Sequence, residues 1–261
     1  MNIVPAIGHP LRVALCLIAC GSFAHAASIV IYGDVADSEV NSTGIFSYDP
    51  GSYGGQVGVN GGYDYSDVYV FQLPVLAPGQ LITAADFSFS DEASSSNYNV
   101  DLYGLTYRSA STVLPSDWYS GPSDPHNTLI QAGIIPSSFS FSGRITSSNS
   151  ADIALVNYLN AQYAAGAVGG NYVFLRLSNS VVNGNNLNVD FVDNADRAYF
   201  VENAFGGPSL AYWENIYSPR LDVTVSDVNI SSVPEPSSMA LLAGGLGVCV
   251  FLKRRIRTKT A

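Results

Sequence analysis

The side chains that could catalyse a reaction are few in this chain of 261 residues. His126 is the only histidine between residues 27 and 232, so a Ser-His-Asp triad would have to use it, and its segment Ser-Asp-Pro-His-Asn is typical of a turn. No HExxH or GxSxG motif and no zinc-spaced cluster of Cys or His occurs. We therefore expect no enzyme. The alternative is a glycan-processing hydrolase, which needs only two facing carboxylates.

Aromatic, acidic and amide side chains stand together in three short segments, and this combination is typical of sugar binding. Sugars stack on aromatic rings and form hydrogen bonds with acids and amides. Packing in the core or rim of a β-sandwich is the alternative role for the same rings. The candidate glycan-binding residues are Tyr63, Tyr65, Trp118, Tyr119 and Trp213.

The segment from residue 183 to residue 196 is rich in Asn and Asp, which offer the hard oxygen ligands that calcium prefers. Asp190, Asp193 and Asp196 are the candidate ligands of a structural calcium ion. The segment lacks the ordered spacing of an EF-hand loop, and segments of this composition also form turns. The sequence predicts no other cofactor.

The charge of residues 27–232 excludes one class of partner. This region has 20 acidic residues, five arginines and no lysine, a net charge of −15. Binding to nucleic acid needs clustered Lys and Arg, so we expect none. All three cysteines lie outside the region, which must fold without disulfides. An acidic surface without lysine suits an extracellular protein that meets neutral sugars or divalent cations.

The elements that position these side chains are mostly short strands. Runs of β-branched and aromatic residues recur between Gly, Asn, Asp and Pro. Ser150–Gly166 instead has a helical pattern, and Thr43–Gly62 predicts a long loop. This order predicts a mainly β fold, an antiparallel β-sandwich of jelly-roll type with one short helix. The predicted strands are Ile29–Tyr32, Val68–Leu73, Leu81–Phe89, Asn99–Leu105, Phe139–Phe141, Tyr172–Leu177, Leu187–Val192, Ala198–Val201 and Leu221–Val225.

The last residues form three consecutive parts. The first part is a glutamate between two prolines. We expect an extended backbone there, because each proline fixes its own φ and keeps the residue before it out of the helical region. An apolar run of 14 residues, Met239–Leu252, predicts a short transmembrane helix, and a basic cluster then predicts a cytoplasmic end. An ordinary anchor that is never cleaved is the alternative. The motif residues are Val233, Pro234, Glu235 and Pro236, and the basic stop is Lys253, Arg254, Arg255 and Arg257.

This three-part layout resembles the PEP-CTERM sorting signal of Gram-negative bacteria that make extracellular polysaccharide. The resemblance implies that an exosortase, a membrane enzyme similar to a transpeptidase, recognises the Pro-Glu-Pro motif and removes the tail. It also implies a transient stage in the inner membrane, followed by the cell surface or the extracellular matrix of a biofilm. Exopolysaccharide is the partner that this location suggests, and a purely structural surface protein that binds nothing specific is the alternative.

The N-terminal residues predict a secretory signal peptide. Val13–Ala24 is the apolar region, and Ala24-His25-Ala26 is a small-x-small cleavage site, so the mature chain would begin at Ala27. A bacterial lipobox that ends at Cys20 is the alternative, and it would make Cys20 a lipidated N-terminus. The expected divisions are a signal peptide (1–26), an exported β-sandwich domain (27–232) and a sorting signal (233–261).

A second resemblance covers roughly residues 64–226. Asp67–Leu73 and Ile82–Phe89 are followed by Trp118, a helix before Tyr172–Leu177, and the segment Pro219–Val225. This progression is similar to that of DNRLRE-type β-sandwich modules of bacterial surface proteins, which are similar to carbohydrate-binding modules. The signature arginines and glutamates are incomplete here, so the resemblance implies a fold and a class of ligand but no ligand site.

Overall fold

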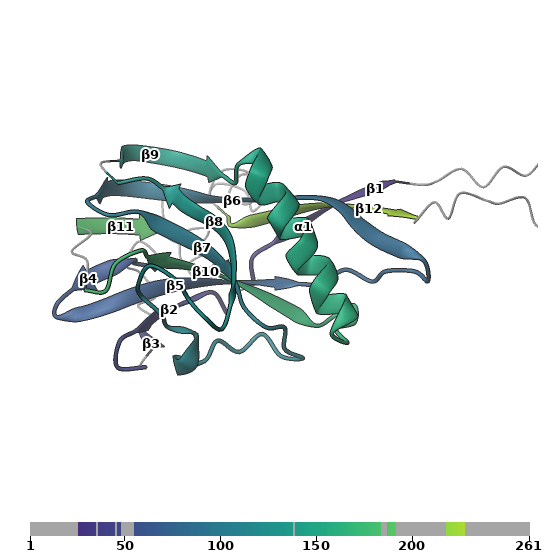
Figure 1. Ribbon diagram of the computed structural model, residues 1–261, viewed down its shortest axis with the longest axis horizontal. Coiled ribbons are helices and arrows are strands. Elements are labelled where there is room, and N and C mark those ends of the chain that lie inside the picture. The colour runs from purple at the N-terminus through teal and green to yellow at the C-terminus, as the bar shows by residue number, and fades with distance from the viewer. Residues whose placement is uncertain are drawn as a thin grey trace, which may run out of the picture.

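The computed structural model describes residues 26–34, 36–44, 46–47, 55–137, 139–183, 187–191 and 218–227. These residues form two antiparallel sheets and one α-helix, which confirms the predicted mainly β architecture (Figure 1). The elements in chain order are β1 (Ala27–Tyr32), β2 (Ser38–Asn41), β3 (Phe46–Ser47), β4 (Gly58–Asn60), β5 (Tyr63–Gln72), β6 (Gln80–Ser96), β7 (Val100–Gly104), the 3₁₀ turn η1 (Pro115–Asp117), β8 (Thr128–Ile135), β9 (Phe139–Thr146), α1 (Asn149–Ala164), β10 (Tyr172–Asn179), β11 (Leu187–Phe191) and β12 (Arg220–Asp227).

The long strand β6 organises the first sheet. Its N-terminal half pairs with β12, which in turn pairs with β1, and its C-terminal half lies between β9 and β11. The second sheet has the strand order β3-β2-β5-β10-β7-β8, and β4 also pairs with β5. All of these pairings are antiparallel, so strands from distant parts of the sequence become neighbours.

The two sheets pack face to face through aromatic rings. Tyr69 of β5 lies 5.6 Å from Phe87 of β6 between ring centroids, and Phe71 lies 5.9 Å from the same ring. Phe87 in turn stacks on Phe89 at 5.3 Å. Side chains alternate across a strand, so every second residue of β5 and β6 enters this shared core. The arrangement is that of a β-sandwich.

The outer face of the second sheet is covered as well. Val68 and Val70 of β5 and Phe174 of β10 join Val113, from the connection between β7 and β8, in a second buried cluster. Strands β5, β7 and β10 are therefore buried on both faces, and β5 and β10 contain the unbroken apolar runs Val68–Phe71 and Tyr172–Leu175.

The helix α1 joins the two sheets. Its first turn is capped by Ser148, whose hydroxyl accepts a hydrogen bond from the Ala151 amide at 3.3 Å. The Asn160 side chain donates to the Ile82 carbonyl at 2.8 Å and accepts from the Ile82 amide at 3.1 Å, and so completes the hydrogen bonding of β6 there. On the other sheet, the Tyr158 hydroxyl donates to the Leu105 carbonyl at 2.6 Å. Figure 1 shows α1 lying across the side of the sandwich.

Four strands that the sequence did not predict are present among the described residues, namely β2, β3, β4 and β8. The predicted loop Thr43–Gly62 was wrong in part, because it contains β3 and β4, which pair with β2 and β5. Each missed strand is short or mixes Gly and polar residues among its apolar positions, and this mixture hides the period of two. The predicted strand Ala198–Val201 lies outside the described residues.

None of the helices in the described part of the chain is long and apolar enough to cross a membrane. The predicted span Met239–Leu252 and residues 1–25 of the predicted signal peptide lie outside that part.

Candidate functional site

A groove of about 410 Å³ lies on the outer face of the first sheet, beside α1. Its floor is formed by β6 and β12, with β1 at the far side, and α1 forms one wall. Most of the lining side chains are short and carry hydroxyl, amide or carboxylate groups, while the exposed Ile153 adds an apolar surface. The main lining residues are Ser28, Thr83, Asp86, Asp152, Ile153, Asn157, Asp222 and Thr224.

Three carboxylates gather at this groove. Asp86 on β6 lies directly opposite Asp222 on β12, and Asp152 comes from the first turn of α1. Burial raises the pKa of Asp86, and repulsion from Asp222 and Asp152 raises it further, against the attraction of two arginines. The groove therefore has a negative potential and an aspartate that binds protons more readily than usual.

Two arginines border the carboxylates. Arg220 forms an ion pair of 2.8 Å with Asp222 on its own strand. Arg144 on β9 donates from Nε to the Ser88 hydroxyl at 3.0 Å and from Nη2 to the Ser218 carbonyl at 3.1 Å. Burial lowers the pKa of Arg144, as does the nearby Arg220. Both guanidinium groups are held in place by these contacts and partly balance the acids.

The predicted glycan-binding tyrosines lie elsewhere, at the start of β5. The rings of Tyr63 and Tyr65 meet edge to face at 6.4 Å between centroids, and Tyr63 is 45% exposed. Burial and the charge of Glu39 raise the pKa of Tyr65. The two rings thus form an aromatic pair that is open to solvent at the end of the sandwich opposite to β1 and β12 (Figure 1).

The other two described candidates lie on the outer face of the second sheet, where they take part in packing. Trp118 is half-buried against the cluster around Val68 and Phe174. The Tyr119 ring lies 5.4 Å from the guanidinium carbon of Arg176, and its hydroxyl donates to the Ser123 carbonyl. The structure therefore does not bring Trp118 and Tyr119 together with Tyr63 and Tyr65, whose rings follow the inward-facing positions of β5.

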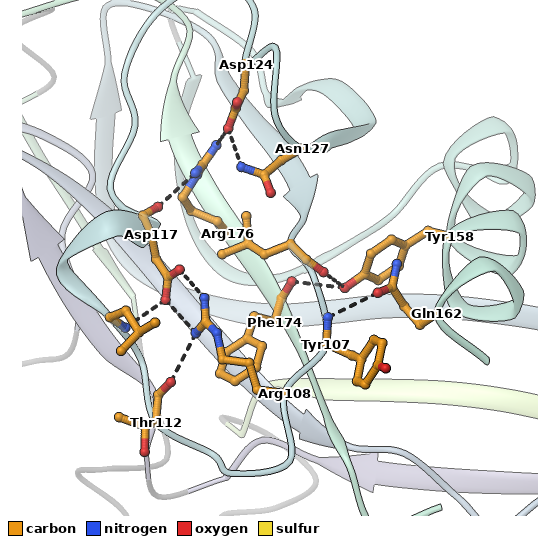
Figure 2. Close-up of polar contacts among 12 residues, drawn as sticks. Tyr107, Arg108, Thr112, Asp117, Asp124, Asn127, Tyr158, Gln162, Phe174 and Arg176 are labelled. Carbon is orange, nitrogen blue, oxygen red and sulfur yellow. Dashed lines mark hydrogen bonds and ion pairs between the residues drawn. The ribbon is translucent and has the colours of Figure 1, made fainter. Parts of the chain in front are cut away.

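Two arginine–aspartate pairs hold the connection between β7 and β8 against the second sheet (Figure 2). Arg108 pairs with Asp117, and its guanidinium lies 4.2 Å from the Phe174 ring centroid. Arg176, fully buried on β10, pairs with Asp124 at 2.5 Å and donates to the Asp117 carbonyl at 2.8 Å. Burial favours neutral Asp124, but hydrogen bonds from Arg176 and Asn127 outweigh it and lower the pKa of Asp124. These contacts fix the connection in place.

Several predicted site residues lie outside the described part of the chain: Trp213, Asp193, Asp196, Ala24 of the cleavage site and the sorting tail. Ala26, the other cleavage-site residue, is exposed directly before β1. Asp190 lies on β11, of which only the backbone is described. Within the described residues there is no group of three or more His, Cys, Asp and Glu arranged to hold a metal ion. His126 is exposed, and its amide donates to the Asp124 carboxylate at 2.8 Å in a turn.

Sequence reasoning missed the groove. Asp86 and Asp222 each fall at an outward position of a predicted strand, and Asp152 falls in the first turn of the predicted helix. Local periodicity placed each side chain on its element. The pairing of β6 with β12 brings Asp86 and Asp222 together, and the packing of α1 against β6 adds Asp152. No local signal in the sequence specifies either contact.

The comparison with protein families concerns the tail. A family model described as the PEP-CTERM protein-sorting motif matches residues 232–255, a segment that contains Pro234-Glu235-Pro236 and ends at Arg255. The predicted motif is thereby confirmed. No curated protein matches the chain. The match indicates a protein that an exosortase-type system processes and that is exported and sorted to the surface of a Gram-negative cell.

Proposed function

We propose that the exported domain is a non-enzymatic component of the cell surface or extracellular matrix that binds exopolysaccharide in the groove beside α1. The observation that carries the proposal is the groove itself. Its volume of about 410 Å³ lies in the range of sites that enclose small ligands. A polymer could lie along such a groove and place one or two sugar units in it.

The lining of the groove supports a sugar as the ligand. Thr83, Thr224 and Asn157 offer hydroxyl and amide groups, and Asp86 offers a strong hydrogen-bond acceptor. Ile153, which is 67% exposed, offers the apolar surface that the C–H face of a sugar ring needs. The net charge of −15 between residues 27 and 232 repels anionic polymers, so the proposal favours a neutral polysaccharide. The resemblance to carbohydrate-binding-like modules supports the same class of ligand.

Gel electrophoresis through a matrix that contains the exopolysaccharide of the native host tests this proposal. The variant Thr83→Trp fills the groove and is expected to abolish the retardation of the protein. Thr128→Trp changes another exposed threonine, at the start of β8, and is the matched control, which should be retarded like the wild type. Equal retardation of all three proteins contradicts the proposal. If Tyr63→Ala is the only variant that abolishes retardation, the polysaccharide binds at the aromatic pair Tyr63 and Tyr65 of β5 instead of the groove.

A second candidate function is glycan hydrolysis, and the opposition of Asp86 and Asp222 favours it. Directly opposed strand residues have Cβ atoms about 4.5–5.5 Å apart. This spacing is similar to the separation of about 5 Å between the carboxyl groups of retaining glycosidases. The raised pKa of Asp86 would suit a general acid. The ion pair between Asp222 and Arg220, however, engages the carboxylate that would act as the nucleophile.

Release of reducing ends from the same polysaccharide distinguishes the two functions. A binding protein releases none, whereas a hydrolase releases them and loses this activity in Asp86→Asn. The proposed processing is tested separately by the intact mass of the protein from cell-surface and culture fractions. A chain from Ala27 to about Pro236 supports removal of both ends, and a chain that extends to Ala261 contradicts removal of the tail.

A further inference from the structure

An acid with no counter-charge among the described residues lies inside the sandwich, on the sheet that does not line the groove. Asp67 on β5 is 0% exposed, and neither of its carboxylate oxygens accepts a hydrogen bond of standard geometry from the described residues. The backbone of Gly55 packs directly against it, since a Cβ at that glycine would lie 2.3 Å from the carboxyl carbon. A buried carboxylate in such a position needs a proton or a cation to balance its charge.

A second acid stands next to it. Glu39 on β2 lies directly opposite Asp67 and is only 8% exposed. Cross-strand partners share one face of a sheet, so both carboxylates belong to the inner face. Among the described residues, the groups that act on the Asp67 carboxyl are Glu39, the Tyr69 hydroxyl and the Val68 amide, and none of these is basic. The described residues therefore enclose two adjacent acids and place no positive group against Asp67.

We propose that Glu39 and Asp67 bind a divalent cation of the Ca²⁺ or Mg²⁺ type, with water completing its coordination shell. Paired carboxylates are the hard oxygen ligands that these ions prefer. The acidic domain attracts cations, and its predicted location outside the cell exposes it to them. The site differs from the calcium ligands expected at Asp190, Asp193 and Asp196, although β11, which carries Asp190, contacts β4 near the same end of the sandwich.

Two tyrosines beside the proposed site can report the binding of a cation by fluorescence. Tyr65 and Tyr69 lie two positions before and after Asp67, on the same face of β5. Each is about 7 Å away along the strand, so either ring can transfer excitation energy to a bound Tb³⁺ ion, which takes the same ligands as Ca²⁺. Titration of the full chain, purified in mild detergent, with Tb³⁺ therefore measures binding directly. Displacement by Ca²⁺ and a rise in the melting temperature with Ca²⁺ give two further readouts.

The expected result is sensitised Tb³⁺ emission from the wild type that Ca²⁺ quenches. Asp67→Asn, which keeps the size of the side chain, should lose both the emission and the Ca²⁺-dependent rise in melting temperature. Glu39→Gln should weaken binding at least tenfold, and it serves as the deciding variant if circular dichroism shows that Asp67→Asn does not fold. Asp86→Asn removes a carboxylate of the groove and is the matched control, which should bind like the wild type.

Three outcomes overturn the proposal: no emission from the wild type, emission that persists in the Asp67 and Glu39 variants, or emission that the Asp86 variant alone abolishes. The first means that a proton alone balances the two acids. The others mean that the ion binds elsewhere, in the groove or outside the two strands. Binding of polysaccharide is measured independently, so failure of the cation site leaves the proposed function unaffected.

Discussion

The replacement Asp67→Asn should remove a large part of the pH dependence of stability when divalent cations are chelated. Burial raises the pKa of Asp67 from 3.8 to about 8, with a further contribution from Glu39. Between pH 3.8 and about pH 8, Asp67 keeps its proton in the folded protein but has released it in the unfolded chain. Unfolding therefore releases a proton in this window, and stability falls as the pH rises. The slope is about 1.36 kcal/mol per pH unit for one proton, or about 2.7 kcal/mol between pH 5 and pH 7.

Urea denaturation of the wild type and of Asp67→Asn at pH 5, 6 and 7, with a chelator present, measures this difference. The asparagine does not titrate, so the free energy of unfolding of the variant should vary less across this range by about 2.7 kcal/mol. Burial also raises the pKa values of Asp64, Asp86 and Asp101, but these groups titrate in both proteins and cancel in the comparison. Equal slopes for the two proteins would refute the reasoning, because they would mean that Asp67 is not protonated in the folded state.

Three further replacements test how the fold is held together, each by its effect on the urea midpoint. Asp124→Asn should cost about 3–5 kcal/mol, because it leaves the fully buried Arg176 without its ion pair, and a midpoint close to that of the wild type would show that the pair is dispensable. Gly104→Ala should cost about 1–3 kcal/mol, since a Cβ there would lie 2.5 Å from the Tyr158 ring; no loss would mean that α1 shifts freely. Ser148→Ala should cost about 1 kcal/mol through the lost helix cap, and an unchanged midpoint would contradict that role.

The fold was predictable where hydrophobic alternation is strong. Val68–Leu73 and Leu221–Val225 place apolar side chains at every second position or in unbroken runs, and both lie within strands of the sandwich. The helix was predictable because its first turn and its terminal glycine are both visible in the sequence. The strand β2 was not, since Glu39 and Asn41 occupy its inward positions, and polar residues there oppose the usual pattern.

The candidate sites were less predictable than the fold, for a physical reason. Tyr63 and Tyr65 are neighbours on one strand, so their proximity follows from the sequence. The opposition of Glu39 to Asp67, and of Asp86 to Asp222, depends on the register between strands. Register is set by the whole buried face rather than by the residues that it brings together. Polar groups on two strands therefore become a site only once the sheet has formed.

The two ends of the described β-sandwich lie side by side. Ala27, where the predicted mature chain begins, lies opposite Val225, so the first and last described strands end side by side. Only five residues separate β12 from Val233, and each spans at most about 3.6 Å, so the sorting motif stays within about 20 Å of this end. The groove, with Ser28 and Thr224 in its lining, lies at the same end. An enzyme bound to the motif and a polymer bound in the groove would thus meet the same end of the domain, and we expect polysaccharide to enter the groove after the tail is removed.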